Sequence, residues 1–404
     1  MNKVARSLTA LALSAALSAG MALMPLAYEP KTAETKADVL NTLGLFKGTE
    51  NGYELDKPLT RMEALIMLIR LSGKELDALY SMKEYEMPFT DAPDWEKADK
   101  YLGYAFENGL AKGISDTEFD PETRASAQMY MTFLLRALGY TDTEEATVWD
   151  NWEKLATDAG LFADSFDREN FLRGDAVLAS RAALDAKTAD GTQTLLEKLQ
   201  KEEAFSSLNL AIAQIEEGKN VTIDSPLIDI MGKVYAGVDG ISADGLVVST
   251  IEPERQSFFI GADAETLPLE EGIVCEPMMS SQAHSVALVR VKDGTNIEEA
   301  KKNIREKVNP RKWICVGVSP ANIHVESIGN TILLVMDNTA PDALANNFRL
   351  LDESYVRADE NGMIKVDDNY IEADEFVNFN SVFKYGEKLN TLAEKYFPEN
   401  TKYF

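Results

Sequence analysis

The sequence predicts a multidomain protein: an all-α half of three helix-loop-helix repeats, followed by a small α+β domain with an antiparallel sheet. Two observations carry this prediction. Segments 40–73, 104–140 and 149–184 share one order of helix, Gly-Leu, loop, cap and amphipathic helix. From about Ser225, strands rich in β-branched residues alternate with short helices instead. A chain of 404 residues with 45% hydrophobic residues is long enough for two or three cores.

The first residues have the pattern of a secretory signal peptide. Two cations precede an uncharged run over 7–28, and small residues place cleavage after Ala22 or after Ala27. We therefore assign residues 1–27 to the signal. An uncleaved membrane anchor is the alternative, because the apolar run is just long enough to span a bilayer. No membrane span is expected after signal removal.

Charge and cysteine content restrict the possible partners. The formal net charge of −27 argues against general affinity for nucleic acid or for an anionic bilayer. An anionic ligand can bind only at locally placed arginines or helix N-termini. Two cysteines in an exported chain of this size indicate a fold that does not depend on disulfides, although pairing of Cys275 with Cys315 stays open.

Matched spacings align the repeats. An aromatic residue, a cap and an arginine are separated by seven and then ten residues in two of them: Tyr53, Thr60 and Arg70, then Phe119, Ser126 and Arg136. The alignment sets Ala127 opposite Arg61 and leaves Arg124 in the preceding loop. In the third copy, which resembles the other two less closely, Arg173 takes the place of Arg61. Removal of Arg124 is therefore expected to have little effect on ligand binding.

Arg61 is placed where it does not favour a helix. Thr60 and Glu63 form the pattern of a capping box, so Arg61 falls in the first turn, where a cation opposes the helix dipole. An arginine beside unpaired N–H groups can instead hold a carboxylate or phosphate. We interpret Arg61 as a ligand group. The alternative is a solvated arginine whose stem covers apolar surface.

These repeats resemble the S-layer homology (SLH) module, three tandem helix-loop-helix repeats with a Thr-Arg-Ala-Glu signature. The signature stands here as "LTRME" at 59–63 and as "LRGDA" at 172–176, and 89–113 resembles the first helix of such a repeat. The resemblance implies non-covalent attachment to an anionic secondary polymer of the Gram-positive cell wall, in grooves between repeats. The residues predicted to bind this polymer are Thr60, Arg61, Glu63, Trp95, Arg173 and Asp175.

The resemblance also sets the domain boundaries. An SLH-like domain is expected over 28–200, with repeats at about 32–74, 89–140 and 149–187, and then a linker or helix over 201–223. Aromatic residues in this half can stack on sugar rings or pack between repeats, and packing is the preferred reading for Trp95, Trp149 and Trp152.

The sequence of the second half predicts a small α+β domain, a sandwich with helices on one face of an antiparallel sheet. The elements expected are a helix at 226–237, a strand at 284–294, a helix at 296–308, two strands in 322–338 around Gly329, and a helix at 341–351. Residues 224–351, particularly "EPMMSSQAHSVALVRVKDG" and "NPRKWICVGV", resemble the DUF4358 family of exported bacterial proteins. That resemblance brings no activity with it. The remaining tail, 352–404, is acidic and then phenylalanine-bearing, with a helix expected over 374–396.

Chemical motifs are few. The sequence contains no G-x-S-x-G, H-E-x-x-H, phosphate-binding loop or dinucleotide fingerprint, so no cofactor is predicted. Cys275, His284, Cys315 and His324 are the candidates for a zinc site, but their spacing is not of the short type that fixes ligands locally, and we expect no metal. The basic-aromatic spot at 311–313 suits either an acidic sugar or peptide, or, as preferred, a helix C-terminus with an anchoring tryptophan.

The sequence therefore predicts a secreted protein of the cell wall or S-layer, attached through its first half and displaying the α+β domain. Two alternatives remain. The second half can be an enzyme acting on wall polymer, because a pair of carboxylates needs neither His nor Cys. It can also be a binding module for a surface protein partner. The missing motifs do not exclude an enzyme, and we favour a non-enzymatic role.

Overall fold

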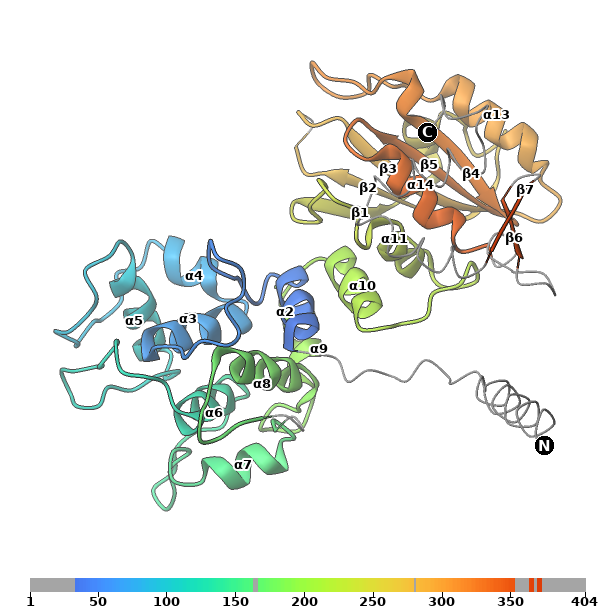
Figure 1. Cartoon of the computed structure of the whole chain (residues 1–404). Coiled ribbons are helices and arrows are strands. Elements are labelled where there is room, and N and C mark those ends of the chain that lie inside the picture. Colours follow the sequence, from blue (N-terminus) through green and yellow to red (C-terminus); the bar gives the residue numbers. More distant parts are fainter. Residues whose placement is uncertain (1–32, 163–165, 280, 353–362, 367–368, 373–404) are drawn as a thin grey trace, which may run out of the picture. The chain divides into compact units, whose positions relative to one another are not determined.

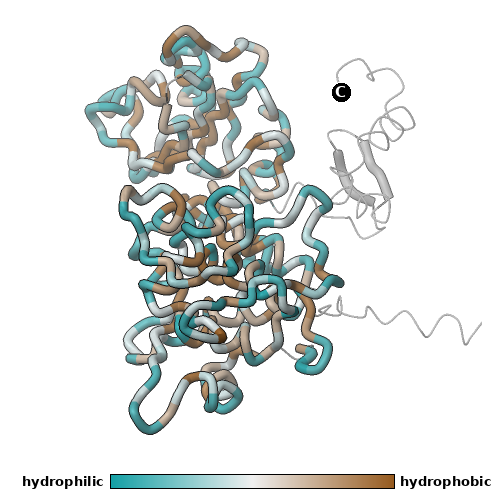
Figure 2. Tube along the Cα trace, turned by 90° about the vertical axis from the view of Figure 1, so that its left-hand side faces the viewer, coloured by the Kyte–Doolittle hydropathy of each residue, from teal (hydrophilic) through white to brown (hydrophobic). Residues whose placement is uncertain are grey.

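The computed structural model describes residues 33–162, 166–279, 281–352, 363–366 and 369–372 (Figure 1). The expected signal peptide and the helix expected near the C-terminus lie outside these residues. Among the described residues, no helix combines the length and apolar character needed to cross a membrane. Hydrophobic segments gather in the interior and hydrophilic ones occupy the outer loops (Figure 2).

The first half is helical, as predicted. Its helices are α2 (Ala33–Thr42), α3 (Arg61–Leu71), α4 (Glu75–Tyr80), α5 (Ala98–Glu107), α6 (Ala127–Ala137), α7 (Trp152–Asp158), α8 (Arg173–Asp185), α9 (Leu195–Lys201) and α10 (Ser207–Glu216). The Ser126 hydroxyl caps α6 by accepting from the Met129 N–H, so α6 begins at Ala127 as the spacing predicts. Helix α3 begins after Thr60 with a complete capping box.

Helices α2, α5 and α7 end in the same way. Each is followed by a glycine with positive φ: Gly44 at 70°, Gly109 at 65° and Gly160 at 71°. The next residue, a leucine in all three, donates its N–H to a carbonyl five residues back. This left-handed cap requires a residue without a Cβ penalty, which explains why Gly-Leu recurs.

A half-buried carboxylate ties three of these helices together. Glu75 at the start of α4 accepts from Arg70 Nε and Tyr101 OH at 2.7 Å each, and pairs with Lys47 at 2.8 Å. Burial raises the pKa of Glu75, but these donors outweigh it and lower the pKa to about 2. Charged Glu75 therefore joins α3, α4 and α5.

The second half is built on a five-stranded antiparallel sheet in the order β1-β2-β3-β5-β4. The strands are β1 (Leu246–Thr250), β2 (Leu269–Pro277), β3 (His284–Val291), β4 (Ile323–Ile328) and β5 (Thr331–Asp337). The helices are α11 (Leu227–Tyr235), α12 (Gln256–Ile260), α13 (Ile297–Lys307) and α14 (Pro341–Arg349), with short 3-10 turns η1 (Pro253–Arg255) and η2 (Pro320–Asn322). A separate hairpin pairs β6 (Met363–Val366) with β7 (Asn369–Glu372).

Helices cover both faces of the large sheet, so the prediction of helices on one face is wrong. Val286 and Leu288 of β3 pack with α11 and α14, whereas Ala287 and Val289 pack with α12 and α13 (Figure 1). A strand buried on both sides reads as a continuous apolar run, as β3 does. Strands β1 and β2 are additional to those expected. Strand β1 is a short, partly exposed edge strand, and β2 has two acids and a bulge directly after its first residue.

The segment 201–223, expected as a linker or helix, contains α10, and α10 is part of a core. Leu208 and Ile212 of α10 pack with residues of α11. The two helices approach closely at Gly232, where an added Cβ would lie 2.7 Å from Ala211 Cβ and 2.9 Å from the Ala211 carbonyl carbon. The segment is therefore a packed element of the fold and not a free spacer.

The Glu75 contacts predict a pH-dependent contribution to stability. Because the folded pKa is about 2 and the ordinary value is 4.5, the charged carboxylate stabilises the fold above about pH 5 and this stabilisation is lost as the pH falls toward 2. We expect Glu75→Gln to lower the free energy of unfolding by about 2 kcal/mol at pH 7 and by much less near pH 2.5. Urea unfolding across this pH range measures the difference. Asp158→Asn, which removes an exposed pair with Lys154, is the control and should have little effect at either pH.

Candidate functional site

The first three N–H groups of α3 all have acceptors within the protein. The N–H group of Arg61 donates to the Thr123 carbonyl at 2.8 Å. That of Met62 donates to the Pro121 carbonyl at 3.0 Å, and that of Glu63 donates to the cap hydroxyl at 3.2 Å. The expectation that Arg61 works beside unpaired N–H groups is therefore wrong. These N–H groups of α3 are therefore not free to hold a ligand.

The Arg61 side chain is buried without a carboxylate partner. It is 6% exposed, its Nη2 donates to the Lys112 carbonyl at 2.7 Å, and its guanidinium lies 4.6 Å from the centre of the Phe119 ring. Its Nε has no hydrogen-bond partner, and it forms no ion pair with a described residue. Burial lowers the pKa of this guanidinium; Asp120 raises it and Arg136 lowers it further. The protein thus keeps a desolvated positive charge incompletely compensated.

Arg61 opens into a cavity of about 480 Å³ between α6 and the loops near it. The cavity is lined by Arg61, Lys112, Gly113, Ile114, Thr132, Phe133, Arg136, Asp142, Thr147, Trp149 and Asp150. Trp149 is 39% exposed and presents an aromatic surface. Guanidinium groups beside an exposed indole are suited to an anionic sugar, because the cations bind the charge and the ring stacks on the sugar.

One carboxylate partly neutralises the cavity. Asp142 accepts from Lys112 at 2.6 Å and lies 3.8 Å from Arg136 Nη2. Burial lowers the pKa of Arg136, while Asp142 raises it. Two cations, Lys112 and Arg136, therefore share Asp142, and Asp150 accepts from the neighbouring Thr147 hydroxyl instead. An anionic ligand would complete the compensation of Arg61 and Arg136.

The predicted site residue Arg173 has a different environment. It is 7% exposed, and its Nη2 donates to Glu63 Oε1 at 2.7 Å. Its backbone N–H donates to the Lys57 carbonyl at 2.9 Å, and the next N–H, of Gly174, donates to the Leu55 carbonyl at 2.8 Å. The Arg173 charge is thus paired within the protein, and Arg173 does not line the Arg61 cavity.

The other predicted acids and the cap hydroxyl serve the helix starts. Thr60 accepts from the Glu63 N–H, and Glu63 Oε2 accepts from the Thr60 N–H at 2.7 Å. Asp175 accepts from the N–H groups of Leu172 and Asp167, both at 2.9 Å. These side chains hold the arginine-bearing helices in place rather than line the cavity.

The structure brings Trp149 to Arg61 and leaves Trp95 elsewhere. Trp95 is 43% exposed, and its ring centre lies 6.1 Å from that of Tyr101. Sequence reasoning did not select Lys112, Arg136 or Trp149 for the site. A signal for Arg136 existed, since its ten-residue distance from the cap matches that of Arg70. No local signal identified Lys112.

Arg124 has a structural position in the loop before α6. Its guanidinium donates to Asn170 Oδ1 at 2.8 Å and to the Phe171 carbonyl at 3.0 Å. The following residue, Ala125, donates its N–H to the Leu59 carbonyl at 2.9 Å. Arg124 therefore connects the loops that precede α6 and α8.

The zinc candidates of the second half do not meet. His284 is buried, with Nδ1 2.9 Å from Asp337 Oδ1 and Nε2 2.6 Å from Tyr235 OH. Cys275 is buried, whereas Cys315 is exposed, and both thiols are free. His324 lies 3.2 Å from Asp342. Within the described ranges, no group of three or more His, Cys, Asp or Glu side chains is arranged to hold a metal ion.

Comparison with known proteins supports the assignment of the first half. Residues 88–126 match the family model described as the S-layer homology domain, which confirms the predicted resemblance for that segment. The matched segment contains α5 and ends at the Ser126 cap of α6.

Three curated relatives are named as proteins of the cell surface, surface layer or cell wall. A "Cell surface protein" of Thermoanaerobacter kivui is 29% identical over 184 residues, covering 43% of this chain and 24% of that protein. A "Surface layer protein" of Brevibacillus choshinensis is 28% identical over 37% of this chain and 14% of its own length. A "Middle cell wall protein" of Brevibacillus brevis is 29% identical, and the match covers 37% of this chain and 15% of that protein. The chain thus spans a quarter or less of these relatives, and the matches support a secreted, cell-wall-associated protein.

The pair of Glu63 and Arg173 predicts a measurable coupling between α3 and α8. In a double-mutant cycle with Glu63→Gln and Arg173→Met, we expect a coupling free energy of about 1 to 2 kcal/mol, because Arg173 is buried and Glu63 is half-exposed. Urea unfolding followed by tryptophan fluorescence measures it. The exposed pair of Lys154 and Asp158 is the matched control and should give about 0.5 kcal/mol or less. Equal coupling in the two cycles would show that Arg173 is not held by Glu63.

Proposed function

We propose that the first half attaches this protein non-covalently to an anionic secondary polymer of the Gram-positive cell wall. The single observation that carries the proposal is Arg61, a buried guanidinium without a carboxylate partner that faces a cavity shared with Arg136 and Trp149. A carboxylate or phosphate of the polymer would pair with Arg61 and Arg136, and a sugar ring would stack on Trp149. Arg173 would contribute less, since Glu63 already pairs with it.

The proposal includes a closed unit of three repeats within residues 28–200. It is supported by the identical helix ends at Gly44, Gly109 and Gly160 and by the hydrogen bonds that join the loops before α3, α6 and α8. The S-layer homology match to residues 88–126 and the named surface proteins support it as well.

The role proposed for the second half is display. Residues 224–351, which resemble the DUF4358 family, would be held outside the wall by the first half, available to a surface protein partner. The buried dyad of His284 and Asp337 offers no free base, because Tyr235 and Asp337 occupy both ring nitrogens of His284 and the N–H groups of Thr339 and Ala340 donate to Asp337. The dyad therefore gives no support to catalysis by His284.

The wall-binding proposal predicts a selective loss on changing Arg61. The secreted chain should sediment with Gram-positive wall that carries an anionic secondary polymer, and Arg61→Gln should weaken this by about 1.5 to 3 kcal/mol, the range for a hydrogen bond to a charged group. This corresponds to roughly tenfold to over a hundredfold in Kd. Arg168→Gln is the matched control, because Arg168 also lies over an aromatic ring in this half, 4.2 Å from the centre of Phe162, but outside the cavity.

Folding of each variant is checked by circular dichroism and by the unfolding midpoint. Trp149→Ala should also weaken binding, whereas Arg173→Gln should act mainly on stability. Undiminished binding by a folded Arg61→Gln, Arg136→Gln double variant would exclude the cavity as the wall-binding site.

A further inference from the structure

The second half carries a basic and apolar surface that its core does not use, here called the 258–316 patch. Its exposed apolar members are Phe258, Ile314 and Val316, at 47%, 68% and 37% exposure. Two exposed arginines adjoin them: Arg255 lies 5.8 Å from the centre of the Phe258 ring, and Arg311 lines one cavity together with Val316. A hydrophobic and cationic surface in a chain of net charge −27 needs an explanation.

Buried Lys312 organises the patch. Its Nζ lies 2.6 Å from Glu276 Oε1 and 5.2, 5.3 and 5.4 Å from the ring centres of Phe258, Phe259 and Trp313. Burial lowers the pKa of Lys312, and Glu276 raises it. Lys312 is therefore compensated internally. The charge left for a partner belongs to Arg255 and Arg311, neither of which forms an ion pair with a described residue.

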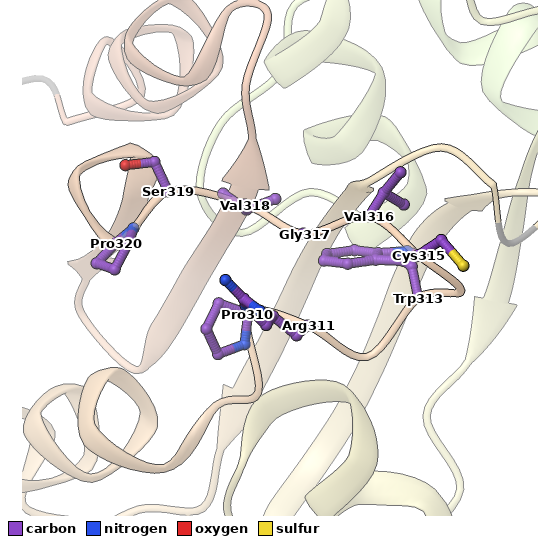
Figure 3. A pocket seen from close by; sticks show the side chains of 9 residues that line it. All are labelled: Pro310, Arg311, Trp313, Cys315, Val316, Gly317, Val318, Ser319 and Pro320. Carbon is purple, nitrogen blue, oxygen red and sulfur yellow. The ribbon is translucent and has the colours of Figure 1, made fainter.

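The loop beneath the patch is firmly built. A cavity of about 630 Å³ lies there, and Figure 3 shows Arg311, Trp313 and Val316 around it. The Val318 N–H donates to the Pro310 carbonyl at 2.9 Å, and the Asn338 amide donates to the Gly317 carbonyl at 3.0 Å. An added Cβ on Gly317 would lie 2.8 Å from the Pro310 carbonyl oxygen, so the two arms of the loop are in close contact. The patch is thus preformed.

Its chemistry selects an acidic peptide with apolar side chains. Arg255 and Arg311 attract carboxylates, but the large exposed aliphatic surface of Ile314 and Val316 gains nothing from a hydrophilic glycan. Residues 372–383, "EADEFVNFNSVF", contain three acids and three phenylalanines and no lysine or arginine. This composition complements both the charge and the apolar surface of the patch.

We infer that residues 372–383 of this chain dock on the 258–316 patch, with Asp374 and Glu375 beside Arg255 and Arg311 and the phenylalanines on Phe258, Ile314 and Val316. The connection permits it: residues 353–362 alone extend to about 33 Å, comparable with the width of a small domain. Tethering also gives an effective concentration in the millimolar range, so weak contacts suffice.

Site-specific photocrosslinking of the secreted full-length chain tests this. A benzoylphenylalanine at Ile314 should crosslink to residues 372–383 of the same chain, as mapped by mass spectrometry, and the yield should fall as salt rises. The same group at Met82, which is fully exposed in the first half, is the control and should not reach this segment. Arg255→Glu with Arg311→Glu should lower the yield about fivefold or more, and Asp374→Lys with Glu375→Lys should restore it.

The outcomes separate the possible occupants. Crosslinks within one chain that respond to both charge reversals support the inference. Concentration-dependent crosslinked dimers would assign the patch to a second copy and overturn it. Protection of Ile314 by added wall polymer, without any crosslink to 372–383, would assign the patch to a glycan and overturn it as well. An absent crosslink in all conditions, in a chain with unchanged circular dichroism, would also contradict it.

Discussion

The first half depends on backbone hydrogen bonds that join the start of one helix to the loop of another segment. Arg61 and Met62 of α3 donate to the loop before α6, and Arg173 of α8 donates to the loop before α3. Arg124 joins the loop before α6 to the one before α8. Buried N–H groups must find acceptors, and the starts of α3 and α8 find them in a neighbouring segment. This mutual dependence fixes where the two arginines at the helix starts project.

The two arginines then differ because of one carboxylate. Arg173 meets Glu63, whose other oxygen closes the capping box of α3, so its charge is used in holding α3 and α8 together. Arg61 stacks on Phe119 and finds a single carbonyl acceptor. The arginine at the start of α8 is thus used in an ion pair, whereas the one at the start of α3 has no carboxylate partner among the described residues. In the complex proposed above, an anion would offset the cost of keeping Arg61 desolvated.

The features that could be predicted from the sequence are those that depend on a few neighbouring residues. Caps and Gly-Leu ends are set by a few neighbouring residues, so the starts of α3, α6 and α8 could be placed from spacing alone. The proximity of Trp149 and Lys112 to Arg61 could not be predicted from the sequence, because it depends on how separate loops fold against α6. Helix cover on both faces of the sheet was missed for a similar reason. The continuous apolar run of β3 indicated it, but short strands such as β1 gave too weak a pattern to show the whole sheet.

Hydrogen-deuterium exchange of the secreted chain, with and without purified anionic wall polymer, tests wall attachment through the Arg61 cavity most directly. Polymer contact should slow exchange at residues 112–114 and 147–150, which line the cavity, and should leave the segment around Trp95 unchanged. Slowed exchange confined to the Trp95 segment or to residues 224–351, with no change at the cavity, would contradict attachment at this site.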